Sequence, residues 1–448
     1  MKESRYNTWV ERDGYAFVFN GLSGGLLRVS AGDRLALVNW LAGVDDMVIA
    51  PDLLEKAIRG RMIVNDDADE VAILEARYGS SRYDERRFAL TIVTSLGCNF
   101  DCPYCFEAKH PSLLRDDVQA ALVALVESKL IQGQNLSVTW YGGEPLVGKK
   151  ALLTLSDRFL ELSRRHGRDY AADIITNGSL LDRSTAEALA ARNVRSAQIT
   201  IDGPPDVHDR MRPLAGGGST FWTIVNNIRA AADVLQIVVR VNIDTANFAR
   251  VSELMAILAD EGLAGQISMY PGQLVAIDDG VASPSASYGS KCFTNREFAT
   301  AEIEFMAAAK SHGFGVWTMP EPVGAPCTAV RANELVIGSR GEIYKCWDSV
   351  GNPDDVIGNL LAPEPDVRAT KWLMYDPFRD AECRGCIALP VCMGGCAHHA
   401  LQDGLYDNRC GTFRHTYLER TQAFVEQMEG AGASEVLARA HAPRMETR

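Results

Sequence analysis

The pattern of hydrophobic and polar residues changes near residue 88. Ahead of that point, short alternating runs predict strands, and runs with apolar residues three or four positions apart predict helices. The expected strands are 6–10, 15–19, 26–29 and 62–64, and the expected helices are 35–41, 53–58 and 69–78. Small elements in this order predict a winged-helix-like α+β module over residues 1–87.

From residue 88 to about 290 the pattern is a regular alternation of strand and helix. The expected strands are 89–94, 137–140, 173–176, 196–201, 237–243 and 266–270, and the clearest helix is 118–130. Six consecutive βα units imply parallel strands joined by right-handed crossovers. Since eight units close a full barrel, the α/β fold class expected here is an open (β/α)6 partial TIM barrel, with its ligand site at the carboxyl ends of the strands.

The remainder is less periodic. Residues 271–295 are rich in turn-forming residues and predict a loop, and 298–309 predicts an amphipathic helix. A hairpin is expected at 334–344. We therefore expect a connecting segment at 291–326, a cysteine-rich domain at 327–415 and a helical tail at 416–448.

Composition limits the class of protein. The 448 residues are 47% hydrophobic and 23% charged, as in ordinary globular proteins, and the net charge of −13 argues against nucleic-acid binding. No apolar run approaches the length of a membrane span, and the N-terminus lacks the apolar core of a signal peptide. The 11 cysteines are an odd number and are grouped, which indicates metal binding in a reducing cytoplasm.

Three of these cysteines, Cys98, Cys102 and Cys105, follow the first barrel strand with the spacing C-x3-C-x2-C. Thiolates suit iron–sulfur clusters, and three ligands leave one iron of a four-iron cluster open to a small molecule. The alternatives are a zinc site, which prefers four ligands in paired sets, and a group of buried thiols.

The C-x3-C-x2-C spacing, with Tyr104 before the last cysteine, resembles the signature of the radical S-adenosylmethionine (SAM) enzymes. The resemblance implies that the amino and carboxylate groups of SAM bind the open iron of a [4Fe–4S] cluster. One electron from the cluster then cleaves SAM to methionine and a 5′-deoxyadenosyl radical, which takes a hydrogen atom from the substrate.

Further motifs occur where the later strands end. Gly-Gly-Glu-Pro follows the second strand and resembles the family motif for the amino group of SAM, while Thr-Asn-Gly and Asp-Gly-Pro follow the third and fourth. His208, taken alone, is more often a structural residue than a catalytic one. The residues that the resemblance assigns to SAM are Tyr104, Gly142, Gly143, Glu144, Pro145, Thr176, Asn177, Asp202, Arg240 and Asn242.

Seven cysteines near the C-terminus form a second group. Their pattern, C-x13-G-x4-C followed by C-x2-C-x5-C-x3-C and a last cysteine, is similar to that of the SPASM domain; a zinc ribbon would explain only part of it. The resemblance implies two auxiliary [4Fe–4S] clusters, and hence three clusters in all. The nearer would use Cys327, Cys346 and Cys396, and the farther Cys383, Cys386, Cys392 and Cys410.

Seven cysteines cannot fill eight ligand positions. The eighth ligand could be Cys292, Glu321, the substrate itself, or nothing, and Cys292 could equally be an ordinary thiol or a catalytic one. Asp348 is a candidate base, because some members of the family use an acid just after the cysteine that corresponds to Cys346.

The resemblance predicts an enzyme that modifies a ribosomally made precursor peptide. A thioether or carbon–carbon crosslink is the leading outcome, with epimerisation or oxidation as others. The module at 1–87 would bind the leader of the peptide as an added strand, and a flavodoxin or ferredoxin would donate electrons. The alternative is a sulfatase-maturing enzyme that makes formylglycine from Cys or Ser, but the long segment ahead of Cys98 argues against it. An iron–sulfur electron carrier or sensor would have no use for the SAM motifs.

Overall fold

The computed structural model describes residues 1–44, 49–107, 109–276, 283–316, 319, 321–362, 367–402 and 406–430. These form two compact units. The first comprises Met1–Arg82 with the described parts of 317–326 and 375–444, and the second comprises the described parts of 83–316 and 327–374. Residues 277–282 of the expected loop and 431–448 of the expected tail lie outside the described residues. No helix in the described part of the chain is long and apolar enough to cross a membrane.

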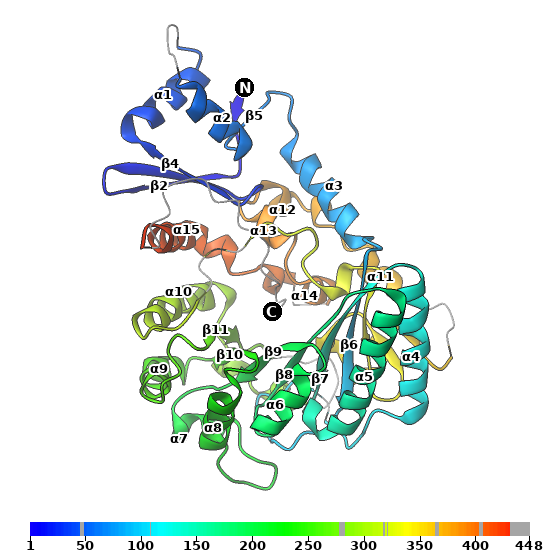
Figure 1. Cartoon of the computed structure of the whole chain (residues 1–448). Helices are drawn as coiled ribbons and strands as arrows, with labels where there is room; N and C mark the ends of the chain where they lie inside the picture. The colour runs from blue at the N-terminus through cyan, green and yellow to red at the C-terminus, as the bar shows by residue number, and fades with distance from the viewer. Residues whose placement is uncertain are drawn as a thin grey trace. The chain divides into compact units, whose positions relative to one another are not determined.

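The second unit is built on one sheet, in the order β11-β10-β9-β8-β7-β6-β12-β13-β14 (Figure 1). Its first six strands are mutually parallel, which confirms the expected α/β core of six βα units. They are β6 (Arg87–Ser95), β7 (Asn135–Gly142), β8 (Tyr170–Thr176), β9 (Val194–Thr200), β10 (Gln236–Ile243) and β11 (Ser268–Gln273).

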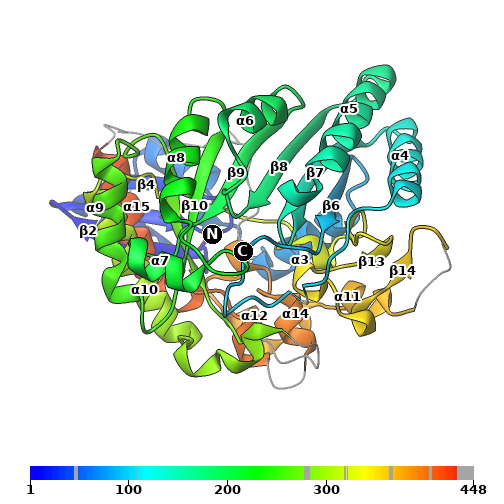
Figure 2. The same ribbon diagram turned by 90° about the horizontal axis from the view of Figure 1, so that it is seen from below.

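Helices lie along the outer face of these strands, as Figure 2 shows. The crossover helices are α4 (Asp116–Ile131), α5 (Lys149–His166), α6 (Arg183–Ala190), α7 (Pro205–Met211), α8 (Phe221–Ala231) and α9 (Val251–Asp260), and α10 (Asn295–Ser311) and α11 (Ala369–Leu373) follow. The apolar face expected for α4 is buried at Val118, Leu122 and Val126. Trp140 of β7 stacks on Phe159 of α5 with their rings 6.3 Å apart. The resulting core fixes the strands, and therefore also the loops at their ends.

The predicted hairpin is present, but its position was not anticipated. It consists of β12 (Glu334–Ile337) and β13 (Glu342–Tyr344), with β14 (Gly358–Asn359) beside β13. β12 pairs in parallel with β6, opposite residues 89–92, so the hairpin extends the barrel sheet. The local pattern of a hairpin indicates its turn and its two arms, but not which other strand it will join.

The first unit begins with the expected α+β elements. The strands β2 (Asn7–Arg12), β3 (Tyr15–Asn20) and β4 (Gly25–Ser30) form an antiparallel sheet, followed by α1 (Ala31–Leu41), α2 (Pro51–Arg59) and α3 (Glu70–Arg82). A short pair that the sequence analysis missed in part, β1 (Lys2–Glu3) with β5 (Ile63–Val64), closes the module. Val18 and Leu27 pack with Leu37, Ala57 and Met62 on one face of the sheet.

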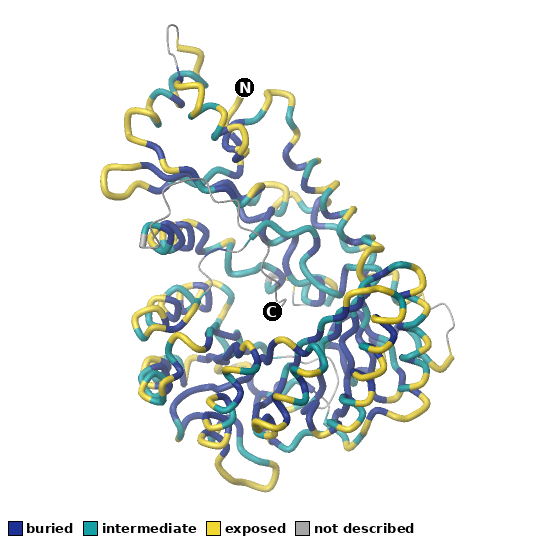
Figure 3. The backbone as a smooth tube through the Cα atoms, viewed as in Figure 1, coloured by how far each residue is buried: buried dark blue, intermediate teal, exposed yellow. Residues whose placement is uncertain are grey.

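The other face of this sheet is covered by α15 (Phe413–Gly430), which is not a surface helix as expected. Val425 packs on Val10 and Phe17, and Tyr417 and Phe424 contact Phe19. Each face of the sheet is thus partly covered, while the ends of β2 and β4 stay exposed (Figure 3). The described residues of the cysteine-rich segment ahead of α15 form the short helices α12 (Ala381–Gly385), α13 (Leu389–Cys392) and α14 (Ala397–Leu401), with 3-10 turns at Pro377–Arg379 and Tyr406–Arg409.

Candidate active site

The loop after β6 carries the first three cysteines. Cys102 is buried, Cys98 and Cys105 are half-buried, and none of the 11 cysteines is in a disulfide. Burial raises the pKa of the Cys98 thiol to about 11 and that of Cys105 to about 12. The backbone N–H of Phe100 donates to Cys98 Sγ at 3.4 Å. Without a metal these thiols are therefore protonated at neutral pH.

The three thiols fit a polynuclear cluster. The Cys102 sulfur contributes to the pKa increase of both Cys98 and Cys105, so the three lie within electrostatic reach of one another. Among the described residues, no three His, Cys, Asp or Glu side chains converge closely enough to hold a single metal ion. A four-iron cluster distributes its thiolates over separate irons, and three soft ligands around one short loop suit that arrangement.

The Gly-Gly-Glu-Pro turn after β7 is held by its own glutamate. Glu144 Oε1 accepts hydrogen bonds from Leu146 N at 2.9 Å and Thr176 Oγ1 at 2.7 Å, and Oε2 accepts from Asn177 N at 2.7 Å. The carboxylate is fully buried and joins the ends of β7 and β8. Gly142 has φ of 139°, and a Cβ there would overlap the carbonyl oxygen of Ser95, so only glycine fits.

A buried polar network connects the cysteine loop to the ends of β9 and β10. Tyr104 donates to Asp202, and Arg212 donates to Tyr104 Oη at 2.6 Å. Asn242 Nδ2 also donates to Tyr104 Oη, at 3.2 Å, and accepts from Arg240 Nε at 2.8 Å. Burial raises the pKa of Asp202, although the Arg212 charge opposes this. Arg212 Nε is buried and has no hydrogen-bond partner among the described residues, so this edge of the guanidinium can bind an anionic group.

His208 has a structural position. Its Nδ1 accepts from Asp202 N at 3.3 Å, its Nε2 lies 3.0 Å from Thr220 Oγ1, and the ring is fully buried. Burial lowers the pKa of His208 well below its ordinary value. The imidazole is thus neutral and holds the loop that carries Arg212.

Tyr288 and Asp244, which the sequence analysis missed, form one wall of the site together with the candidate residue Cys292. Tyr288 donates to Asp244 Oδ2 at 2.6 Å, and its ring meets that of Tyr104 edge to face at 5.9 Å. Cys292 follows closely, with Sγ 3.8 Å from the carbonyl oxygen of Tyr288. No motif marks Tyr288, since it lies in a turn-rich loop whose contacts depend on the fold.

Asp348 lies near the cysteine loop. Burial raises the pKa of Glu107 to about 7, and the charge of Asp348 contributes to this increase. Tyr141 hydrogen-bonds to the same Glu107 carboxyl group. Trp347 stacks on Tyr141 with ring centroids 5.9 Å apart. The segment after Cys346 thus lies against the end of β7. Glu107, two residues beyond Cys105, was also missed.

The cysteines of the farther predicted cluster all belong to the first unit. Burial raises the pKa of Cys383 to about 12, with contributions from Cys392 and Cys410, and Cys410 also raises that of Cys386. Arg414 donates to Cys410 Sγ at 3.3 Å. The Cys392 and Cys410 sulfurs thus lie within electrostatic reach of Cys383, and Cys410 also of Cys386, and the cluster that the four would hold stays a prediction. Cys396 and Glu321 belong to the first unit but Cys327 and Cys346 to the second, so the nearer set stays a prediction.

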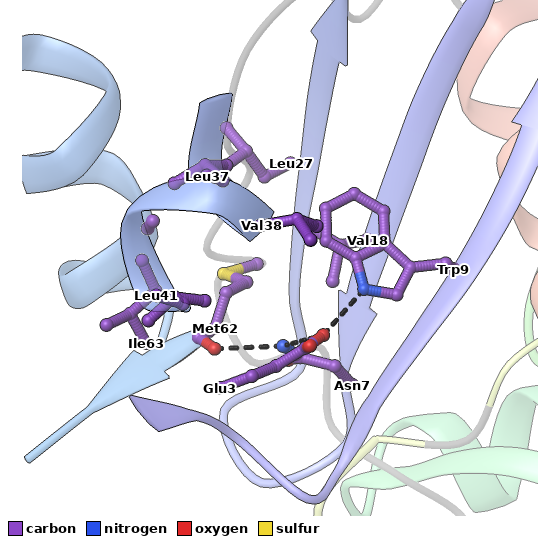
Figure 4. A pocket seen from close by; sticks show the side chains of 11 residues that line it. Glu3, Asn7, Trp9, Val18, Leu27, Leu37, Val38, Leu41, Met62 and Ile63 are labelled. Carbon is purple, nitrogen blue, oxygen red and sulfur yellow. Dashed lines mark hydrogen bonds between the residues drawn. The ribbon is translucent and has the colours of Figure 1, made fainter. Parts of the chain in front are cut away.

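The N-terminal module has an apolar pocket beside β2 (Figure 4). Trp9 of β2 and Val38 and Leu41 of α1 are among the residues that line it. Glu3 lies at its polar end, where its Oε1 accepts from Trp9 Nε1 at 2.6 Å and Asn7 Nδ2 at 3.2 Å. The pocket is small and presents an apolar surface next to a carboxylate.

Comparison with known proteins identifies the core. Residues 92–258 match the model of the Radical SAM superfamily, and the chain therefore carries a radical SAM domain.

Among curated proteins, a cysteine-type anaerobic sulfatase-maturating enzyme of Clostridium perfringens is 31% identical over 138 residues, which are 28% of this chain and 36% of that protein. The radical SAM cyclopropyl synthase TigE of Paramaledivibacter caminithermalis is 24% identical over 254 residues, covering 47% of this chain and 53% of TigE. The chain thus matches about a third to a half of the length of these relatives.

Two solved structures share the fold. The structure of anSMEcpe with bound AdoMet has a TM-score of 0.56 at 16% identity, and the match covers 78% of this chain and 98% of that one. The structure of Streptococcus suis SuiB bound to its precursor peptide SuiA has a TM-score of 0.53 at 13% identity, covering 92% and 99% of the two chains.

Proposed function

We propose that this chain binds SAM and a [4Fe–4S] cluster at the strand ends of its barrel and modifies a ribosomally made peptide, forming a thioether or carbon–carbon crosslink. The observation that carries this proposal is the convergence of Cys98, Cys102 and Cys105 with the polar network around Tyr104 and Arg212. When bound, the two cofactors supply a hydrogen-abstracting radical by one-electron cleavage of SAM. In this proposal the protein binds and orients the cofactors and the peptide, and it shields the radical from solvent.

The side chains at the strand ends have distinct roles in this proposal. Cys98, Cys102 and Cys105 hold the cluster. The Glu144 carboxylate accepts three hydrogen bonds from the protein and so positions the turn, and the backbone near Gly142 would hold the amino group of SAM. The buried Nε–H of Arg212 is suited to an anionic group of a ligand.

The substrate side is formed by other residues. Tyr288 packs on Tyr104 and excludes water from the site on that side. Asp348 is assigned here as a proton acceptor, because it lies near Glu107 and Tyr141 rather than in the core. The radical would take a hydrogen atom from one substrate group, and Asp348 would take the proton that the second group loses as the crosslink forms. In this proposal the auxiliary clusters, held by the C-terminal cysteines, accept the remaining electron.

The module at 1–87 would capture the leader of the peptide. Each face of its sheet is partly covered, so an incoming strand must add at an edge, and β2 and β4 are the edge strands. Main-chain hydrogen bonds at an edge give affinity, and a pocket for a side chain gives specificity. The apolar surface of the small Trp9 pocket beside β2 would contact an apolar leader residue, with a neighbouring cation near Glu3.

The test uses the full-length protein, reconstituted anaerobically and co-expressed with short peptides encoded beside it. We expect formation of 5′-deoxyadenosine and a peptide that has lost two hydrogen atoms. Replacing Trp9 by alanine should weaken leader binding about tenfold, whereas replacing the exposed Trp222 should not. Deoxyadenosine without any change in a peptide would contradict the choice of substrate.

A second candidate is maturation of a sulfatase, which is favoured by the 31% identity to the enzyme from Clostridium perfringens. This reaction leaves an aldehyde on the peptide, which a hydrazide reagent traps. A hydrazide-reactive product from a Cys- or Ser-containing sulfatase peptide would favour it over crosslinking.

A further inference from the structure

Two tyrosine hydroxyls in the first unit are buried without a hydrogen bond. Tyr6 is 0% exposed and Tyr417 is 5% exposed, and neither hydroxyl has a partner among the described residues. A hydroxyl removed from water without a new hydrogen bond is costly. Two such groups in one unit indicate an acceptor that the described residues do not supply.

The backbone of Tyr6 and the hydroxyl of Tyr417 both lie next to Gly21. A Cβ on Gly21 would overlap the Tyr417 hydroxyl, and Gly21 N donates to the carbonyl oxygen of Tyr6 at 2.9 Å. Arg5, the neighbour of Tyr6, donates to the carbonyl oxygen of Arg384 at 2.8 Å. The segment around Tyr6 is thus fixed against the turn that begins the cysteine-rich segment.

Cys386 lies within electrostatic reach of both tyrosines. It packs against the apolar cluster that contains Tyr417. A negative charge on its sulfur contributes to raising the pKa of Tyr6, which burial brings to about 12, and it does the same for Tyr417. Cys386 belongs to the four cysteines assigned above to the farther auxiliary cluster, and Arg414 already donates to another of them, Cys410.

We propose that the hydroxyls of Tyr6 and Tyr417 donate hydrogen bonds to the Cys386 sulfur or an adjacent sulfide of the farther auxiliary cluster, and so raise its reduction potential. This inference rests on the cluster assignment in the proposed function. Hydrogen bonds to sulfur set the potential of such clusters, because they stabilise the reduced and more negative state.

The inference gives the N-terminal module a second role. Tyr6 immediately precedes β2, one of the strands to which a leader could add. A peptide bound at that edge would order the backbone beside Tyr6. The electron affinity of the cluster would then depend on whether the module is occupied.

The experiment is a potentiometric titration of the reconstituted full-length protein, followed by electron paramagnetic resonance. The signal of the farther cluster is the one lost in a Cys410→Ala variant. At the wild-type midpoint, Tyr6→Phe and Tyr417→Phe should each lower the ratio of reduced to oxidised cluster about fivefold, as expected for the loss of one neutral hydrogen bond. Tyr15→Phe, in the neighbouring strand and 41% exposed, is the matched control and should leave the ratio unchanged.

The possible outcomes distinguish failure of the hydrogen-bond inference from failure of the cluster assignment on which it rests. Intact cluster signals with an unchanged midpoint in both variants would overturn the inference and indicate a buried water as the acceptor. Absence of any signal that depends on Cys410 would overturn the cluster assignment instead. Should one variant fail to fold, the other decides, since Tyr6 and Tyr417 belong to different elements.

Discussion

The strand-end site of the barrel and the cysteine-rich segment 381–411 hold their cysteines in opposite ways. In the barrel, each functional side chain follows a strand whose neighbours are fixed by a large core, and the polar groups bond mainly to one another. In the cysteine-rich segment, the helices α12, α13 and α14 have five, four and five residues. Such short helices have no stability of their own.

The difference shows where each region obtains its order. The barrel site is organised by the sheet before any cofactor binds, as expected for a site that must orient SAM. If the proposed cluster is present, the cysteine-rich segment would depend on ligation as well as on the apolar contacts of Ala388 and Val391, because metal binding contributes directly to the stability of a region of short helices. An ion-pair network in which Arg409 bonds to Asp380 at 2.8 Å and to Glu382 at 3.2 Å supplies part of the remaining order.

The largest effect is expected from the first barrel cysteine. Cys98→Ala should reduce deoxyadenosine formation about a thousandfold or more, while the far-ultraviolet circular dichroism spectrum stays unchanged, because the sheet holds the loop. Cys292→Ala, in which SAM cleavage is expected to persist, is the control. Unfolding of the Cys98 variant would show that the barrel site, too, depends on its metal.

The second-largest effect is expected on stability, from the buried ion pair between Arg212 and Asp202 in the barrel. Arg212→Ala leaves Asp202 as a fully buried carboxyl without its cation, a change that typically costs about 3–5 kcal/mol. Urea unfolding measures this loss in the free energy of unfolding. The control is Arg210→Ala, at an exposed neighbouring position, which should change the free energy of unfolding by less than about 0.5 kcal/mol. An Arg212 variant as stable as wild type would mean that the network is not what organises the strand ends.

Removal of iron should separate the two regions. Chelation is expected to speed amide exchange over 381–411 by about 10–100-fold, whereas the strands β6 to β10 keep their protection because their hydrogen bonds need no metal. Hydrogen exchange with mass spectrometry resolves both segments in one sample. Equal loss of protection in strands and cysteine-rich segment would remove the contrast between them.

The smallest effect belongs to an exposed ion pair outside both regions. Hydrogen bonds from Arg86 lower the pKa of Asp84 to about 2, but the Arg86 side chain is 89% exposed, so solvent screens the pair. Its stabilisation is present above the ordinary Asp pKa and is lost as the pH falls through about 2. Arg86→Ala should change the free energy of unfolding by less than about 0.5 kcal/mol at pH 7, and the difference from wild type should vanish in strong acid.

The sequence predicted best those elements whose signal is local. The parallel strands and the helix at 118–130 follow from periodicity, and the Cys98 loop from its spacing. The sequence did not indicate which distant segments these elements contact. Nothing in the residues 334–337 says that they pair with β6, and the apolar residues of α15 do not say that they cover the N-terminal sheet.

The site shows the same limit. The motifs located Tyr104, Asp202 and Asn242, but their joint hydrogen bonds with Arg212 arise only when the ends of β9 and β10 meet the cysteine loop. Tyr288 and Glu107 carry no motif. The sequence did not indicate that the Glu144 carboxylate accepts three hydrogen bonds from the protein, and its assignment to the amino group of SAM stays a prediction.

The most direct test of the account is the fate of the hydrogen atom. Full-length reconstituted protein would be incubated with SAM, a reductant and a precursor peptide deuterated at its side-chain carbons. The account predicts deuterium in the 5′-deoxyadenosine and a crosslinked peptide in matching amount. Deoxyadenosine that forms at the same rate but carries no deuterium from the peptide would contradict it.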